Sequence, residues 1–230
     1  MEIDYLKPAT RIGKNINCLT LTDHFFKKNE IDSNKSNLLR DFHKFDGVPI
    51  QYMEQIHGST TQIVNSYSME PKLKTDALLS SRPNLALAAF SADCMPIAIA
   101  RSDGSEFALL HAGWKGLYEG VIESCVKTFS SSDSNLNAWI GPSISSDNYE
   151  VDKDLFEAFT EKNAESKSNF SERSFNKWSF DLQGEATRIL NDFGVDVQNS
   201  HFCTYDSEIM YSFRREETEK RMLTIIWRNE

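Results

Sequence analysis

Short apolar runs recur along this chain, separated by polar segments rich in glycine, proline, serine and asparagine. The run at 85–92 is apolar at nearly every position, which is typical of a central strand covered on both faces. The same reasoning predicts strands at 49–53, 61–65, 76–80, 85–92, 96–100, 107–111, 137–140, 195–203 and 223–227.

Apolar residues at helical spacing lie between these strands. From Leu117 onward every fourth residue of 116–129 is apolar, which predicts one amphipathic helix. A second helix should follow Asp152, and a third should cover 182–193 and end at Gly194. Because strands and helices alternate irregularly, they favour a mixed α/β fold class over a regular βαβ barrel.

The 230 residues are enough for one substantial core, and we expect a single domain over residues 1–230. Two polar stretches, 130–135 and 161–177, are predicted to be exposed connections. Hydrophobic residues make up 40% and charged residues 26% of the chain, as in ordinary globular proteins. Its apolar runs are too short to cross a bilayer, so we expect no membrane partner.

A formal net charge of −9 argues against a nucleic-acid partner, because no basic stripe is present to contact phosphates. The acidic start Met1-Glu2-Ile3-Asp4 has no apolar signal-peptide region, so we expect a cytoplasmic protein. The four cysteines, Cys18, Cys94, Cys125 and Cys203, lie far apart. In that compartment they are expected to be free thiols, available for metal binding or catalysis rather than disulfides.

Three residues that can bind a metal stand at the ends of predicted strands: His57, Cys94 and His111. A thiolate and two imidazoles are good ligands for Zn²⁺, and three protein ligands leave one coordination position open for water or substrate. The same residues also fit a cysteine hydrolase in which Cys94 attacks and His111 is its base. The third residue, His57, favours the metal.

Neighbouring residues extend the predicted site. Asp93 directly precedes Cys94 and is a candidate acid or base, whereas Asp76 is more typical of an ordinary turn carboxylate. Gly113 and Lys115 lie in a predicted strand-to-helix turn, where free backbone N–H groups favour an anion. They are therefore candidate substrate-binding residues.

Two adjacent arginines, Arg214 and Arg215, are the strongest candidates for binding phosphate. A guanidinium group offers a planar fork of donors that lysine lacks. A local arginine site would also compensate the negative charge of the chain, which repels free phosphate.

Several short segments together form a highly specific pattern. They are Gln55-Ile56-His57-Gly58, Thr75-Asp76-Ala77-Leu78, Ala92-Asp93-Cys94-Met95-Pro96, His111-Ala112-Gly113-Trp114-Lys115-Gly116, Trp139-Ile140-Gly141-Pro142, Tyr149-Glu150-Val151 and Ser212-Phe213-Arg214-Arg215. In this order they resemble the YfiH/laccase-domain family, whose members are also called multicopper polyphenol oxidase-like proteins and purine nucleoside phosphorylases. The resemblance covers roughly residues 45 to 228.

The resemblance implies a single layered α/β/β/α domain with mixed β-sheets, and zinc at His57, Cys94 and His111. It also implies phosphorolysis of adenosine, guanosine, inosine and methylthioadenosine, with nucleoside and phosphate as partners, together with adenosine deamination. Copper-dependent polyphenol oxidation and peptidoglycan-precursor editing are attached to relatives too, so Cu²⁺ is a second metal to consider. The zinc deaminase signature of H-x-E with P-C-x-x-C is missing, so any deamination must use another arrangement.

Two departures from the family pattern stand out. Ser143 follows Gly141-Pro142 where relatives commonly carry cysteine, which removes one soft ligand and weakens a multi-copper interpretation. The usual Thr-x-Arg-x-Gly-Gly turn is replaced by residues 20–25, which contain no glycine. We expect a cytosolic zinc-site enzyme acting on purine nucleosides. The alternatives are the cysteine hydrolase and a non-catalytic module stabilised by zinc, which four ligands would favour.

Overall fold

The computed structural model describes residues 3–68 and 74–230, so Met1 and Glu2 of the acidic start lie outside the described residues. The strands are β1 (Tyr5–Leu6), β2 (Ile16–Leu21), β3 (Lys44–Phe45), β4 (Val48–Tyr52), β5 (Thr61–Ile63), β6 (Ala77–Ser80), β7 (Ala86–Ser91), β8 (Met95–Arg101), β9 (Phe107–Ala112), β10 (Leu136–Ile140), β11 (Glu150–Asp152), β12 (Phe170–Ser174), β13 (Lys177–Phe180), β14 (Asp196–Asn199) and β15 (Met222–Arg228). The helices are α1 (Asp23–Lys28), α2 (Lys35–Asp41), α3 (Trp114–Glu119), α4 (Val121–Thr128), α5 (Lys153–Lys162), α6 (Leu182–Asp192) and α7 (Phe213–Glu216), with 3₁₀ turns η1 (Ser146–Asn148) and η2 (Ala164–Asn169).

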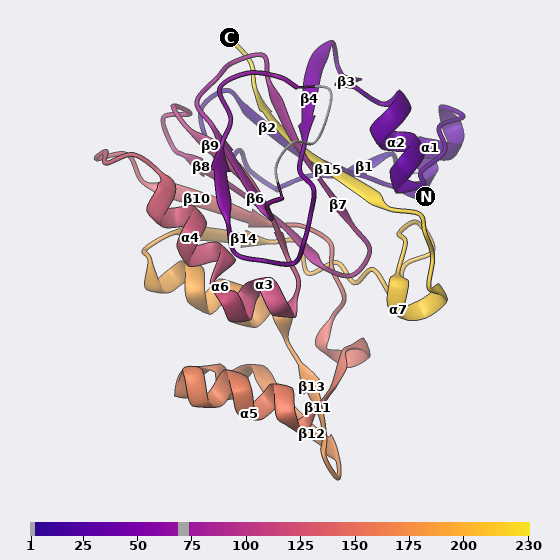
Figure 1. Cartoon of the computed structure of the whole chain (residues 1–230), viewed down its shortest axis with the longest axis vertical. Helices are drawn as coiled ribbons and strands as arrows, with labels where there is room; N and C mark the ends of the chain where they lie inside the picture. The colour runs from indigo at the N-terminus through magenta and orange to yellow at the C-terminus, as the bar shows by residue number, and fades with distance from the viewer. Residues whose placement is uncertain (1–2, 69–73) are drawn as a thin grey trace.

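Two six-stranded sheets form the centre of the molecule (Figure 1). The first has the strand order β1-β2-β15-β7-β4-β3, and the second has the order β14-β10-β8-β9-β6-β5. Both are mixed, since β7 is antiparallel to β15 but parallel to β4, and β10 is antiparallel to β8 but parallel to β14. Their facing sides bury a shared core that includes Leu87, Phe107, Leu109, Trp139 and Ile226.

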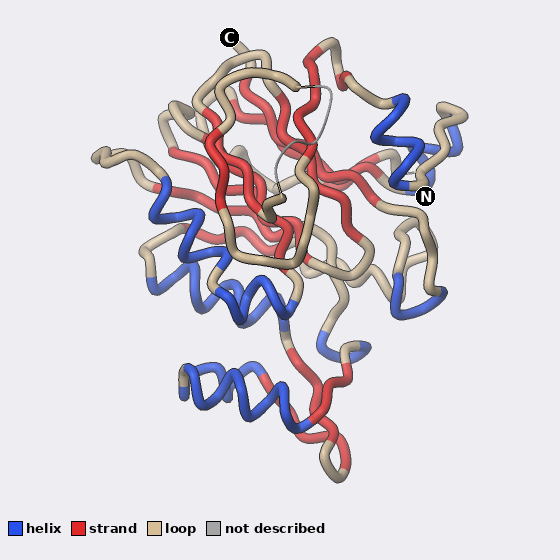
Figure 2. Tube along the Cα trace, viewed as in Figure 1, coloured by secondary structure: helices blue, strands red, loops and turns tan. Residues whose placement is uncertain are grey.

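Helices cover the outer face of each sheet (Figure 2). Cys125 of α4 and Ile189 of α6 pack in one core with the outward residues of the second sheet. Phe26 of α1 and Leu38 of α2 pack in another core with those of the first sheet. A small third sheet, β11-β13-β12, lies with α5 at the lower end of the molecule in Figure 1. This arrangement confirms the expected layered α/β/β/α fold with mixed sheets.

Each predicted strand is present, because a run that is apolar on both faces is stable only between two covering layers. The strand predicted at 195–203 is shorter, since β14 ends at Asn199. The helix predicted to follow Asp152 is α5, and its N-cap is Asp152, although the carboxylate bonds Lys177 instead of a helix N–H. The helix predicted over 182–193 is α6, and Gly194 follows it at φ +69°.

Two sequence predictions were wrong, one of them in part. The single helix expected over 116–129 is two helices, α3 and α4, because Gly120 between them has a left-handed backbone with φ +92° that a continuing helix cannot contain. The stretch 161–177 is mostly exposed as expected, but it is not a plain connection, since it forms η2 and β12 and begins β13. The expected loop at 130–135 contains no helix or strand. Within residues 3–68 and 74–230, no helix combines the length and apolar character needed to span a membrane.

Candidate metal centre

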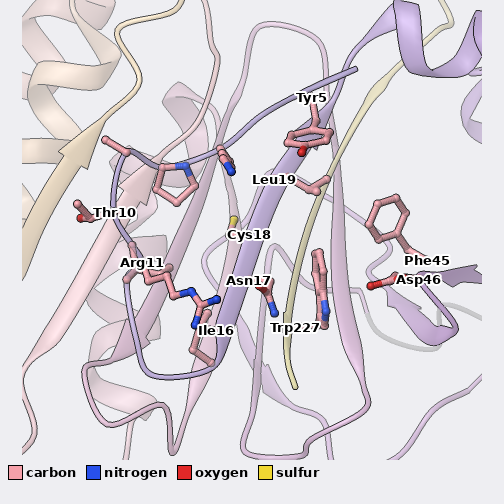
Figure 3. Close-up of a pocket in the computed structure, with 14 residues that line it drawn as sticks. Tyr5, Thr10, Arg11, Ile16, Asn17, Cys18, Leu19, Phe45, Asp46 and Trp227 are labelled. Carbon is pink, nitrogen blue, oxygen red and sulfur yellow. The ribbon is translucent and has the colours of Figure 1, made fainter. Parts of the chain in front are cut away.

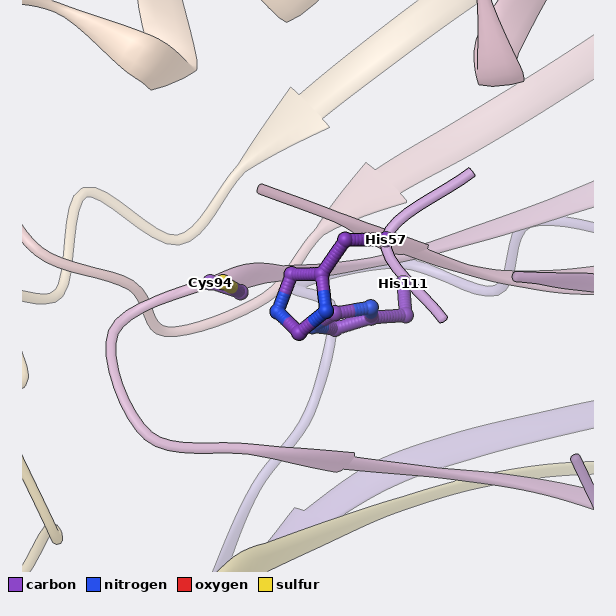
Figure 4. Close-up of side chains that lie close together, drawn as sticks. All are labelled: His57, Cys94 and His111. Atoms are coloured by element: carbon purple, nitrogen blue, oxygen red, sulfur yellow. The ribbon is translucent and has the colours of Figure 1, made fainter. Parts of the chain in front are cut away.

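Three separate segments bring His57, Cys94 and His111 together (Figure 4). His57 lies in the loop after β4, Cys94 lies in the tight turn between β7 and β8, and His111 lies in β9 opposite Pro96 of β8. One ligand atom from each residue lies within 4.8 Å of the others. The two imidazole rings are 4.8 Å apart between centroids and nearly perpendicular, at 81°.

A buried carboxylate, Asp76, orients both histidines. Its Oδ1 lies 2.8 Å from Nδ1 of His111, and its oxygens accept hydrogen bonds from the backbone N–H groups of Ile56, His57 and Gly58 at 2.7 to 3.1 Å. The bond to Nδ1 leaves Nε2 of His111 to face the ligand position. Asp76 was expected to be an ordinary turn carboxylate, and that prediction was wrong, because the group is fully buried with four bonded partners.

Backbone geometry brings the thiol close to the histidines. Asp93 and His57 both have positive φ, at 85° and 60°, a conformation uncommon outside glycine that redirects the chain sharply at both points. Gly113 lies directly beside Cys94, since a β-carbon placed on it would be 2.7 Å from the sulfur and 3.6 Å from a carbon of His57. Glycine at 113 is therefore what leaves space for the thiol.

The electrostatics of the site favour a thiolate. Burial by itself would raise the pKa of the Cys94 thiol, but the charge and hydrogen bonds of His111 and the bond from His57 outweigh it and lower the pKa to about 6. Burial would lower the pKa of His111, yet the Cys94 thiolate and Asp76 raise it to about 9. Burial would raise the pKa of Asp76, but the hydrogen bond and charge of His111 and the N–H groups of Gly58 and Ile56 hold it below its usual value.

These residues fit a bound metal ion. A soft thiolate and two imidazoles, one of them oriented by a carboxylate, form a donor set typical of zinc. Tetrahedral zinc holds such ligand atoms roughly 3.3–3.8 Å apart, so the observed spread of up to 4.8 Å requires only a small contraction. Three protein ligands leave one position open, which is the arrangement of catalytic rather than structural zinc.

The three ligands face a cavity of about 420 Å³. Its lining residues are Lys35, Gln55, His57, Phe90, Ser91, Ala92, Asp93, Cys94, His111, Ile144, Tyr149, Phe213, Arg214 and Arg221. A cavity of this size lies within the range typical of small-molecule sites.

The predicted substrate residues have different environments. Arg214 lines the cavity, with its guanidinium carbon 4.9 Å from the centre of the Tyr149 ring and one nitrogen donating to the carbonyl of Glu150. The guanidinium of Arg215 instead donates to the backbone carbonyls of Thr204, Tyr205, Ser207 and Met210. Arg215 is not part of the cavity lining, so of the two arginines Arg214 is the one that faces the cavity.

Two further candidates, Lys115 and Asp93, are less available to a molecule bound in the cavity than expected. Lys115 is not among the cavity residues, and its ammonium lies 5.5 Å from the Trp114 ring centre. Asp93 does line the cavity, but one oxygen accepts from the hydroxyl of Thr204 and the other from the backbone N–H of Arg214. With both oxygens bonded, Asp93 is better suited to positioning Arg214 than to exchanging protons.

Sequence reasoning missed Lys35, Gln55, Ser91 and Arg221 in this lining. Lys35 lies in a polar segment far upstream of the motifs, and nothing in its local sequence signals its position. Arg221 carries no motif of its own, although its side chain precedes the predicted strand at 223–227.

A larger hollow of about 550 Å³ lies beside β2 (Figure 3). Tyr5, Phe45 and Trp227 line it with Arg11 and the buried thiol of Cys18, whose pKa is raised by burial. Among the residues that the structure describes, the group of His57, Cys94 and His111 is the one set of three or more candidate ligands that come together. The candidate metal ligands therefore face the cavity of about 420 Å³ and not this hollow.

A layered α/β/β/α fold with a His-Cys-His centre at its strand ends defines the class of protein. The chain belongs to the family described as multi-copper polyphenol oxidoreductase laccase, whose model matches residues 15–229. This match confirms the family resemblance of the sequence motifs.

Two similar sequences and one solved structure support this family assignment. The chain is 33% identical to purine nucleoside phosphorylase YfiH of Escherichia coli (strain K12) over 178 residues, covering 76% of this chain and 72% of that protein. It is 30% identical to a purine nucleoside phosphorylase of Haemophilus influenzae over 243 residues, covering 96% and 98%. The crystal structure of Neisseria meningitidis protein NMB0706 superposes with a TM-score of 0.87 at 25% identity, covering 99% of this chain and 100% of that chain.

Replacing Asp76 should loosen the metal site without unfolding the chain. In Asp76→Asn one acceptor becomes a donor, so the bonds that orient His57 and His111 cannot all form. We expect zinc affinity to fall about ten- to a hundredfold, measured by competition with a chromophoric chelator. Asp133→Asn, an exposed loop substitution, is the control, and equal affinities for the two variants would contradict the orienting role of Asp76.

A methyl group at residue 113 should displace the thiol. Gly113 has φ −87°, which alanine adopts freely, so Gly113→Ala acts only through the clash with the Cys94 sulfur. We expect weaker zinc binding with a nearly unchanged far-ultraviolet circular dichroism spectrum. Gly58→Ala is a matched control, because its β-carbon would meet its nearest neighbour at 3.5 Å, an ordinary contact. Unchanged zinc affinity in Gly113→Ala would refute the close approach.

Proposed function

We propose that this chain is a zinc-dependent enzyme that cleaves purine nucleosides with phosphate. The observation that carries the proposal is the convergence of His57, Cys94 and His111 on a cavity that also contains Arg214. The names of the relatives, purine nucleoside phosphorylases at 30 to 33% identity, support the same reaction.

In phosphorolysis, an oxygen of hydrogen phosphate donates an electron pair to the anomeric carbon of the nucleoside. The bond from that carbon to the purine nitrogen breaks, and the base leaves with the bonding electrons. The hydrogen of hydrogen phosphate ends on the purine nitrogen, and the other product is ribose 1-phosphate, or 5-methylthioribose 1-phosphate when the substrate is methylthioadenosine. Zinc held by His57, Cys94 and His111 would supply a Lewis acid at the open coordination position.

Residues of the chain have separate tasks in this scheme. Arg214 binds the phosphate charge, and the stacked Tyr149 ring and the backbone bond to Asp93 hold its position. The exposed ring of Phe213 and the side of Phe90 give the cavity apolar surface for a purine. The substrates are adenosine, guanosine, inosine and methylthioadenosine.

A second reaction proposed for the same cavity is adenosine deamination, in which water adds to the purine and ammonia leaves. The nucleoside and phosphate are the proposed partners, and we propose a cytoplasmic location. The four cysteines support that location, because all are free thiols as in a reducing compartment.

One observation favours the cysteine hydrolase as a second candidate. Asp76, His111 and Cys94 form a linear set in which the carboxylate bonds one side of the imidazole and the thiol is close to the other side. That is the arrangement of a nucleophile, a base and an orienting acid, and peptidoglycan-precursor editing would be chemistry of this type. His57 has no task in such a triad, whereas a metal site uses all three residues.

Copper-dependent phenol oxidation is the reaction that the family description names. A multi-copper site needs further ligand groups, and the described part of the chain assembles one group of three. We therefore propose zinc as the working metal and copper as an incidental substitute.

Zinc content separates the metal from the nucleophile. We expect about one zinc per purified chain, lost in alanine variants of His57, Cys94 or His111 but retained in Cys125→Ala, whose thiol lies in a helix core. Chelation should expose Cys94 to alkylation, and no covalent substrate adduct should form on it. Full zinc in Cys94→Ala, or a glycosyl or acyl adduct on Cys94 of active metal-free enzyme, would overturn the zinc assignment.

Phosphate dependence tests the reaction and the role of Arg214. Removing one charge-assisted contact from the bound phosphate should raise the apparent KM for phosphate roughly ten- to a hundredfold in Arg214→Ala. Lys115→Ala, whose side chain lies outside the cavity lining, should keep the wild-type value. Bound zinc should be unchanged in both variants. Nucleoside cleavage that is independent of phosphate in the wild-type chain would disprove phosphorolysis.

A further inference from the structure

The charge of the cavity differs from that of the chain as a whole. The chain carries a formal net charge of −9, yet Lys35, Arg214 and Arg221 all line the cavity beside the histidines. Asp93 is the carboxylate of this lining, and both of its oxygens already accept hydrogen bonds. Cations gathered in a partly enclosed cavity create a local positive potential that favours an anionic ligand.

Backbone pairing places two of these cations side by side. Asn34 and Lys220 form an isolated antiparallel bridge, and the N–H of Arg221 donates to the carbonyl of Ser33 at 2.9 Å. Lys35 follows Asn34 as the first residue of α2, and Arg221 follows Lys220 directly before β15. Both side chains therefore line the same cavity. The two residues are 186 positions apart in the sequence (221 minus 35).

Neither cation is paired with a carboxylate among the described residues. Burial lowers the pKa of Lys35 and the charge of Arg221 lowers it further, while the more weakly acting charges of Glu54 and Asp76 raise it. The Lys35 ammonium lies 5.7 Å from the Phe90 ring centre, and Arg221 donates through one nitrogen to the carbonyls of Thr218 and Lys220. Two like charges held close together repel each other, and an anion bound between them relieves that repulsion.

A buried hydroxyl in the same cavity also has no partner. Ser91 at the end of β7 is 2% exposed, and its Oγ has no hydrogen-bonding partner in the described structure. Because an unbonded buried hydroxyl is costly, such groups in native proteins commonly meet a ligand or water. Ser91 lies in the cavity lining together with Lys35 and Arg221.

We propose that Lys35, Arg221 and Ser91 form a binding site for a phosphate oxyanion, supplied as inorganic phosphate. This inference rests on the proposed function and adds to Arg214 the residues that bind the second substrate. A guanidinium offers two parallel donors to phosphate, an ammonium adds a compact charge, and a hydroxyl adds a further neutral donor. The bound anion reduces the repulsion between Lys35 and Arg221.

Binding of inorganic phosphate to the zinc-loaded full chain tests the site directly. Calorimetry, with and without inosine, should give a dissociation constant about tenfold or more higher in Lys35→Met and Arg221→Met than in the wild type. Lys220→Met is the matched control, because Lys220 is exposed, is adjacent to Arg221 in sequence and is not part of the cavity lining. This variant should bind phosphate normally. Arg221→Lys should restore part of the affinity lost in Arg221→Met.

Ser91→Ala has a signature that a purely structural residue would not give. Without phosphate, removal of the unbonded hydroxyl should leave the melting temperature unchanged or higher. With phosphate, the rise in melting temperature should be smaller than in the wild type. A lower melting temperature without phosphate and a normal phosphate response would show that Ser91 only packs.

The outcomes separate this site from the proposed reaction. Phosphate that binds through Lys35 and Arg221 without any nucleoside cleavage would support the site and defeat the proposed function. Phosphorolysis with a wild-type KM for phosphate in Lys35→Met would support the proposed function and defeat the phosphate site. Adenosine monophosphate tests whether the oxyanion comes from a nucleotide instead. The proposal would be overturned if adenosine monophosphate raised the melting temperature of the chain while inorganic phosphate, with or without inosine, did not.

Discussion

The buried carboxylate of Asp76 is the interaction on which the candidate site depends. A carboxylate removed from water is unfavourable unless hydrogen bonds replace its hydration. Here three backbone N–H groups of the 56–58 segment and Nδ1 of His111 provide them. Satisfying one buried charge therefore holds the His57 loop in its left-handed conformation and aims His111. The two histidines, one in the loop after β4 and the other in β9, are coupled through a single group.

The sequence predicts the central strands well because they are apolar on both faces. It misses β1, β2, β3, β11, β12 and β13, and in β2 Asn17 and Thr20 look solvent-exposed. In the structure Thr20 is buried, and its hydroxyl bonds that of Thr224 at 2.7 Å across the β2–β15 pair. Two polar residues 204 positions apart satisfy each other, which no local pattern reveals. The break at Gly120 in the helix predicted over 116–129 was missed for the opposite reason. The φ of +92° at Gly120 is a local property that apolar spacing alone does not report.

The candidate metal ligands could be found from sequence because each ends or interrupts an apolar run near a predicted strand end, and strand ends of layered folds meet at one edge. Lys35, Arg221 and Ser91 give no such signal. Their significance comes from what surrounds them: one bridge between distant segments, and a carboxylate, Asp93, that is already bonded. The role of a charged side chain depends on which charges surround it, and the sequence does not show this. A cationic cavity in an acidic chain can therefore be recognised only from the structure.

The environment of Ser143 changes how the missing family cysteine should be interpreted. From sequence, serine at 143 means the loss of a soft metal ligand. In the structure Ser143 is fully buried, accepts a hydrogen bond from Gln183 at 2.8 Å, and is not part of the lining of the metal cavity. A thiol in its place would face Gln183 of α6 rather than the His57, Cys94 and His111 group. The serine therefore serves packing between α6 and the segment that follows β10, and the case for zinc over copper rests on the three candidate ligands that do converge.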